Sequence, residues 1–200
     1  MKIKMFIILA ALVASVASSR ADITGHTLAA DGDGVITCNI YDLTNTSPYN
    51  YRLDIYGDHN VWAPGHILGD ILTDTELDPT LALYQAIDND TSFAWGGYQV
   101  KVTMNKTFAF SNVNVANSGW TFITTTPTMV GTNYIGYIDY YAGTPVLIGG
   151  TLDFNYSISF VGSVQFCEEL TPSAVPEPGT FALVACGLAG LLVMRRRSAS

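Results

Sequence analysis

Positive charge is scarce in the body of this 200-residue chain. Six of the nine lysines and arginines lie near the two ends, and residues 22–174 keep only Arg52, Lys101 and Lys106. Sixteen of the 17 acidic residues lie in this stretch, since only Glu177 falls outside it, so its formal net charge is 3 minus 16, or −13. Such a surface repels phosphate backbones. We therefore expect a soluble extracellular body with no nucleic-acid partner.

The residue patterns of common enzymes are also lacking. No G-x-S-x-G elbow and no P-loop occurs, and only His26, His59 and His66 offer an imidazole base. A pair of carboxylates that cleaves glycosides leaves no pattern in one sequence, but glutamate is scarce in the body. We expect no catalytic residues and a non-enzymatic protein, with a hydrolase as the least favoured alternative.

The body has no sustained helical period and instead shows a period of two. Residues 152–160, 98–104 and 49–55 alternate apolar and polar side chains, as half-buried strands do. In residues 108–115 the parity slips near Ser111 and Asn112, which predicts a β-bulge. Further strands are expected at residues 35–43, 81–87, 120–125, 134–141 and 164–168.

Short strands between Gly, Asn, Asp and Pro turns predict an all-β fold. We expect an antiparallel β-sandwich or jelly roll formed by a single domain at residues 22–170. Residues 57–79 look less regular, which indicates a long excursion with a short helical turn near residues 73–77. No internal repeat is visible.

The N-terminus has the pattern of a secretory signal peptide. Lys2 and Lys4 precede an apolar stretch at residues 5–16, which is too short for the roughly 20 residues of a membrane-spanning helix. Ser19 and Ala21 place small side chains before the expected cut between Ala21 and Asp22, and a cut after Ser19 is the alternative. Residues 1–21 are therefore predicted to be a signal peptide.

The C-terminus has the pattern of a membrane anchor. Residues 171–179, with three prolines, predict an extended linker, and residues 180–194 predict a transmembrane helix. The uncharged residues 179–194 would reach about 24 Å as a helix, slightly less than a hydrocarbon core of about 30 Å. The basic stop that follows lies in a predicted cytoplasmic tail, residues 195–200, and places the body on the far side of the membrane. It consists of Arg195, Arg196 and Arg197.

The same segment resembles a known sorting signal. Its motif, apolar run and basic stop, in this order, are similar to the PEP-CTERM signal of bacteria with two membranes. The motif consists of Val175, Pro176, Glu177, Pro178 and Gly179. The resemblance covers about residues 174–198 and implies recognition by exosortase, an integral membrane cysteine protease that removes the tail. It assigns no family to the body.

The resemblance also implies a location and a biological setting. The expected path is export, a transient inner-membrane anchor, and then the cell surface or extracellular matrix. PEP-CTERM systems accompany polysaccharide export, which implies a link to exopolysaccharide and biofilm. Our leading hypothesis is thus a non-enzymatic surface or matrix protein, and the alternative is a carbohydrate-binding module, assisted by calcium or not.

Two kinds of binding residue motivate that alternative. Aspartates in turns offer oxygen ligands for calcium, with weak candidates at Asp31, Asp33, Asp88 and Asp90, although the spacing excludes an EF-hand and solvated turns are the simpler interpretation. Aromatic rings stack on sugars, but most fill cores. The aromatic candidates are Trp62, Trp95, Tyr98, Tyr140 and Tyr141.

Two cysteines lie in the body, Cys38 and Cys167, and export permits a disulfide between them. Closing so long a loop could stabilise the fold by about 5 kcal/mol. Strand parity points partly the other way, because Cys38 shares a face with apolar neighbours and Cys167 with polar ones. A disulfide and two separate thiols both remain open.

Overall fold

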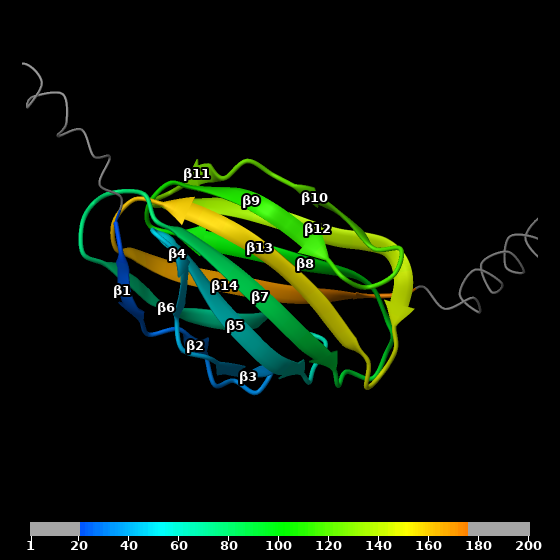
Figure 1. Ribbon diagram of the computed structural model, residues 1–200. Helices are drawn as coiled ribbons and strands as arrows, with labels where there is room; N and C mark the ends of the chain where they lie inside the picture. The colour runs from blue at the N-terminus through cyan, green and yellow to red at the C-terminus, as the bar shows by residue number, and fades with distance from the viewer. Residues whose placement is uncertain (1–20, 176–200) are drawn as a thin grey trace, which may run out of the picture.

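A computed structural model describes residues 21–175, which form two β-sheets stacked face to face (Figure 1). The described residues contain no helix, and so none long and apolar enough to cross a membrane. The predicted signal peptide up to residue 20, most of the sorting motif and the predicted transmembrane helix at residues 180–194 lie outside the described residues. The all-β prediction for the body is confirmed.

The first sheet, sheet A, has eight strands in the order β1-β6-β14-β8-β12-β10, with β2 beside β6 and β11 beside β12. Its pairings are antiparallel. The strands are β1 (Ile23–His26), β2 (Ala29–Ala30), β6 (Gly65–Thr73), β8 (Trp95–Met104), β10 (Thr121–Thr124), β11 (Thr128–Val130), β12 (Asn133–Val146) and β14 (Val164–Ala174).

The second sheet, sheet B, has six strands in the order β3-β5-β7-β13-β9, with β4 beside β5. The strands are β3 (Ile36–Ile40), β4 (Thr44–Ser47), β5 (Asn50–His59), β7 (Thr80–Asn89), β9 (Phe108–Val115) and β13 (Thr151–Phe160). The pair β5–β7 is parallel, which corrects the expectation of a purely antiparallel sandwich. The chain leaves sheet B after β5, adds β6 to sheet A, and returns to sheet B beside β5 as β7.

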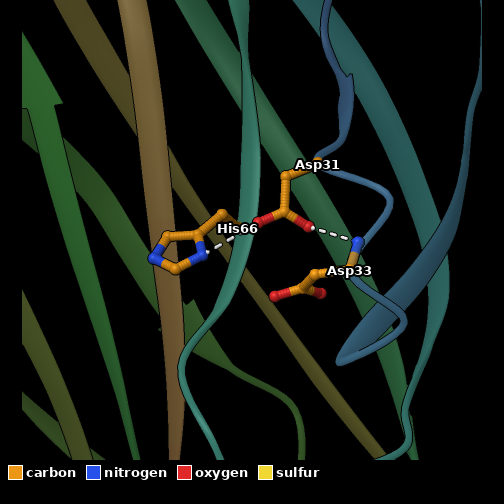
Figure 2. A group of neighbouring side chains, drawn as sticks. All are labelled: Asp31, Asp33 and His66. Carbon is orange, nitrogen blue, oxygen red and sulfur yellow. Dashed lines mark hydrogen bonds and ion pairs between the residues drawn. The ribbon is translucent and has the colours of Figure 1, made fainter.

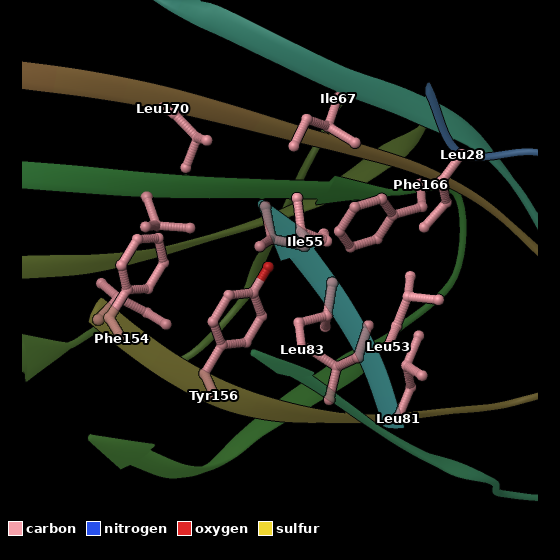
Figure 3. Packing of buried hydrophobic residues seen from close by; sticks show 14 of the residues in the cluster. Leu28, Leu53, Ile55, Ile67, Leu81, Leu83, Phe154, Tyr156, Phe166 and Leu170 are labelled. Carbon is pink, nitrogen blue, oxygen red and sulfur yellow. The ribbon is translucent and has the colours of Figure 1, made fainter. Parts of the chain in front are cut away.

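The core lies between the sheets and follows the period-two pattern. In β13, Leu152, Phe154, Tyr156 and Ile158 point inward and are buried. They meet inward side chains of both sheets, among them Leu83 of β7 and Phe166 of β14 (Figure 3). The predicted bulge in β9 is confirmed, because the β9–β13 register shifts beside Ser111 and Asn112 has a left-handed backbone with φ 49°.

The region at residues 57–79 is more regular than expected. β5 continues to His59, β6 follows, and residues 74–77 form bends without a helical turn. Ile67 and Ile71 of β6 enter the core. Gly69 breaks the alternation between them because it lies against the backbone of Thr27, where a side chain would not fit.

The last strand extends further than the sequence pattern indicated. Residues 171–174 were expected to belong to a linker, but they continue β14 and pair with β8 as far as Ala174 opposite Trp95. The adjacent Val175 amide donates to the Ala94 carbonyl at 3.0 Å. Pro172 is tolerated because β6 ends opposite Leu170, so that one side of β14 has no ladder to satisfy here.

An internal repeat that the sequence did not reveal relates β5–β6 to β7–β8 by 30 residues. The parallel register pairs Asn50 with Thr80 and continues to His59 with Asn89. At each strand end a buried side chain bridges the following turn. The Nε2 of His59 donates to the Ala63 carbonyl at 2.9 Å, and the Nδ2 of Asn89 donates to the Phe93 carbonyl at 2.9 Å. The repeat is hidden because different residue types make equivalent bonds.

The Asn89 bridge gives a test of the fold. Asn89 is fully buried and also donates to the Val146 carbonyl at 3.0 Å, so it holds two turns together. Asn89→Ala leaves these carbonyls without a partner and should lower the free energy of unfolding by about 2–4 kcal/mol, as measured by urea denaturation. Asp90→Ala, at the neighbouring exposed position, is the control and should change it by less than about 0.5 kcal/mol. Equal effects of the two substitutions would contradict the bridging role.

Candidate functional site

The outer face of sheet B carries a shallow trough across its central strands. Cross-strand rows place Tyr56 beside Ala86 and Asp153, and Asp54 beside Tyr84 and Asn155. The small side chain of Ala86 lowers the surface at the centre. Two adjoining depressions of about 280 and 320 Å³ share Tyr56 and Ala86, and together we call them the sheet-B trough.

Aromatic side chains form the walls of the sheet-B trough. Tyr56 and Tyr84 are exposed, and Tyr41 stands edge-on against Tyr56 with ring centroids 5.4 Å apart. The Arg52 guanidinium lies 4.0 Å from the centre of the Tyr84 ring and is held by Asp54 through a 2.7 Å ion pair. That carboxylate raises the pKa of Arg52. The trough therefore combines ring faces with fixed polar groups, which suits the mixed surface of a sugar.

Two carboxylates lie next to each other at one end of the trough. Asp58 and Asp88 are register partners on adjacent parallel strands. Each accepts a hydrogen bond from a hydroxyl, Asp58 from Thr37 and Asp88 from Thr151. These hydrogen bonds hold the two carboxylates in place. Their remaining lone pairs can accept hydrogen bonds from a polar ligand.

Most of the aromatic residues that the sequence offered as sugar-binding candidates are buried in the core. Trp95, Tyr98 and Tyr140 are buried, whereas Trp62 and Tyr141 are exposed. Tyr141 lines a separate depression of about 600 Å³ on sheet A, beside the end of β14. The tyrosines of the sheet-B trough were missed, although Tyr56 and Tyr84 have the outward parity opposite buried Ile55 and Leu83.

The calcium candidates separate into different places. Asp31 and Asp33 lie beside His66, and one possible ligand atom from each residue lies within 4.8 Å of the other two (Figure 2). Within residues 21–175, this is the one group of three such residues. Asp88 belongs to the sheet-B trough, and Asp90 is exposed in a turn.

The donors of the Asp31–Asp33–His66 group include an imidazole, which suits calcium less well than a transition metal. His66 Nδ1 lies 3.1 Å from Asp31 Oδ2, and the Asp33 amide donates to Asp31, which lowers the pKa of that carboxyl. Calcium takes six to eight oxygen ligands, whereas two carboxylates and an imidazole suit a transition metal completed by water.

Both body cysteines are free thiols in the structure. Cys38 of β3 packs, partly buried, against the core between the sheets. Cys167 of β14 lies on the outer face of sheet A, where its register partners are Leu68 and Thr103. Burial raises the pKa of both thiols, which makes them poor nucleophiles. Of the two alternatives left open, the structure shows the separate thiols.

A buried carboxyl group occupies the core. Glu168 of β14 is fully buried, accepts hydrogen bonds from Gln85 at 2.6 Å and Tyr156 at 2.9 Å, and has a pKa raised to about 7 by burial. Its Oε2, the Oε1 of Gln85 and the hydroxyl of Tyr140 have no partner. The sequence contains the signal, because Glu168 shares parity with Phe166 and Leu170, but that signal was overlooked.

The comparisons with known proteins identify the C-terminal segment. Residues 174–197 match the family described as PEP-CTERM protein-sorting motif. The chain therefore carries a sorting signal of proteins exported to the cell surface through a C-terminal membrane anchor, and the motif implies exosortase as its processing partner. No curated protein and no solved structure matches the chain. The motif begins where β14 ends, at Ala174.

Glu168 predicts an unusual pH dependence of stability. Its pKa is higher in the folded chain (about 7) than the ordinary 4.5, so its contribution to stability is complete below pH 4.5 and is lost as pH rises to 7. The loss amounts to about 3 kcal/mol. Glu168→Gln should remove this pH-dependent loss. Between pH 4 and pH 8, the free energy of unfolding of the variant should therefore rise by about 3 kcal/mol relative to that of the wild type, as measured by denaturant titrations.

The matched control is Glu169→Gln, on the outer face of the same strand, where the carboxylate pairs with Lys101 at 2.8 Å. This variant should keep the loss that the wild type shows between pH 4.5 and 7. If Glu168→Gln and the wild type follow the same curve, Glu168 does not titrate in the way described.

Proposed function

We propose that this protein is a non-enzymatic surface or extracellular-matrix component, delivered by an exosortase and associated with exopolysaccharide. The observation that carries the proposal is the sorting motif, which begins at the last residue of β14. The body between the export signals is a single sandwich whose strongly acidic surface suits an extracellular location.

The sheet-B trough supports polysaccharide as the ligand of this body. A sugar ring would stack on Tyr56 or Tyr84, with its hydroxyls bonding to Asp54, Asn155 or the carboxylates near Asp88. Arg52 supplies one of the three cations of the body, so an acidic polysaccharide would be placed by this residue against an otherwise acidic face.

A hydrolase is the competing interpretation of the same face. Asp58 and Asp88 are register partners on adjacent strands, and paired carboxylate chemistry uses carboxyl separations of about 5–10 Å. We favour binding because both carboxylates accept bonds from neighbouring hydroxyls. Reducing ends released by the wild type from a polysaccharide it binds, and lost in Asp58→Asn, would reverse this preference.

Tail removal can be followed by mass spectrometry of the protein released from the cell. We expect a chain that lacks residues 180–197, because exosortase processing removes the tail. Replacing Arg195, Arg196 and Arg197 by glutamate should abolish processing, since the stop relies on positive charge. Replacing the same residues by lysine is the matched control and should leave processing intact. A mature protein that retains its tail would refute exosortase processing.

Sugar binding can be tested by affinity electrophoresis in gels containing neutral or anionic polysaccharides. Tyr84→Ala removes a ring face and the support of Arg52, so we expect at least a tenfold weaker retardation constant, equivalent to about 1.4 kcal/mol. Tyr141→Ala, at a similarly exposed tyrosine on sheet A, should leave retardation unchanged. Loss of retardation in Tyr141→Ala alone would move the site to sheet A.

A further inference from the structure

We propose that the end of the sandwich from which the tail departs docks on the lipid surface while the tail anchors the chain. The docking elements are four apolar side chains at loop tips, Val61, Trp62, Leu147 and Ile148, which we call the apolar rim. The inference rests on the membrane anchor of the proposed function and adds an orientation and a lipid contact for the body.

The side chains of the apolar rim are among the most exposed large apolar ones in residues 21–175. Val61 is 51% exposed, Trp62 64%, Leu147 66% and Ile148 62%. They come from two turns, residues 60–64 between β5 and β6 and residues 147–150 between β12 and β13. Scattered exposed residues are ordinary in soluble proteins, but adjacent pairs at neighbouring loop tips indicate a contact surface.

Hydrogen bonds place these turns at one end of the molecule. Trp62 packs against Phe93 of the β7–β8 turn in a tilted arrangement, with ring centroids 4.6 Å apart. Asn89 at the start of that turn bonds to the Phe93 and Val146 carbonyls, and its own carbonyl accepts from the Gly149 amide at 2.7 Å. The three turns are therefore held together.

The tail leaves the sandwich at this same end. The Val175 amide bonds to Ala94 in the β7–β8 turn, and Figure 1 shows β14 ending at the opposite end of the sandwich from the start of β1. Five residues, 176–180, separate Val175 from Phe181 in the apolar segment. The six steps from Val175 to Phe181 span at most about 22 Å, so the apolar segment begins within about that distance of Val175.

The tail end differs from the far end in its exposed tryptophan and not in its charge. The end that bears the tail presents the apolar rim, and tryptophan is a side chain that favours the interface between headgroups and acyl chains. The far end presents the apolar pair Met129 and Val130 but no exposed tryptophan, and it would face away from the bilayer because the tail departs from the other end. Carboxylates lie at both ends: Asp22, Asp74, Glu76 and Asp78 at the far end, and Asp33, Asp58, Asp88 and Asp90 at the tail end. Asp58 and Asp88 near the rim disfavour anionic lipid, so docking should be strongest on zwitterionic headgroups.

Trp62 provides the test, because it is the exposed one of three tryptophans, and Trp95 and Trp120 are buried. The chain with its tail is reconstituted in phosphatidylcholine vesicles, with or without lipids brominated on their acyl chains. We expect brominated lipid to quench part of the emission, and Trp62→Phe to lose this quenchable part completely. Unquenched emission in the wild type would overturn the docking.

A displaced probe is the matched control. Trp62→Phe combined with Leu77→Trp moves the exposed indole to the β6–β7 turn at the far end, where brominated lipid should not quench it. Equal quenching of both probes would show that the body has no preferred end, and would overturn the proposal. Quenching that appears only after membrane protein is added would assign the rim to a protein partner instead.

Flotation of the same vesicles separates this inference from the function it rests on. If the chain does not float with the vesicles, the anchor fails and the docking fails with it. If the chain floats but Trp62 is not quenched, the anchor stands and the lipid contact alone is refuted.

Discussion

The backbone pairing of β14 with β8 is the interaction on which the rest of the structure depends. It joins the strand that precedes the sorting motif to the centre of sheet A, as far as Ala174 opposite Trp95. Gly96 allows Val175 to lie close to β8, since a Cβ at Gly96 would be 3.0 Å from the Val175 side chain. Within the described residues the chain thus stays paired in the sheet up to Val175, and it leaves the sandwich at one defined end.

Buried polar side chains secure the same architecture at the points where strands turn. Asn89 and His59 close the turns of the internal repeat, and burial lowers the pKa of His59, which keeps it neutral and able to accept from Tyr98. Glu168 differs, because it places a carboxyl group in the core with one oxygen, Oε2, unpaired. Its raised pKa makes this group a cost to stability at neutral pH.

The sequence predicted what depends on local alternation. The strand at residues 152–160 and the β9 bulge follow from side-chain parity, and both were found. The parallel β5–β7 pair was not predictable in this way, because parity does not specify the neighbour of a strand. The β14 extension was missed because Pro172 is typical of a linker, and β6 was missed because Gly69 interrupts its alternation. The sheet-B trough needed the cross-strand rows that bring Tyr56 and Tyr84 together.

Hydrogen exchange at the Val175 amide tests the central claim most directly. The account holds that β14 remains paired up to the sorting motif, so this amide, bonded to the Ala94 carbonyl at 3.0 Å, should exchange far more slowly than an unstructured amide. Exchange at the unstructured rate, with the amides of Phe166 and Leu170 still protected, would show that the sheet ends earlier and that a free linker separates the body from its tail.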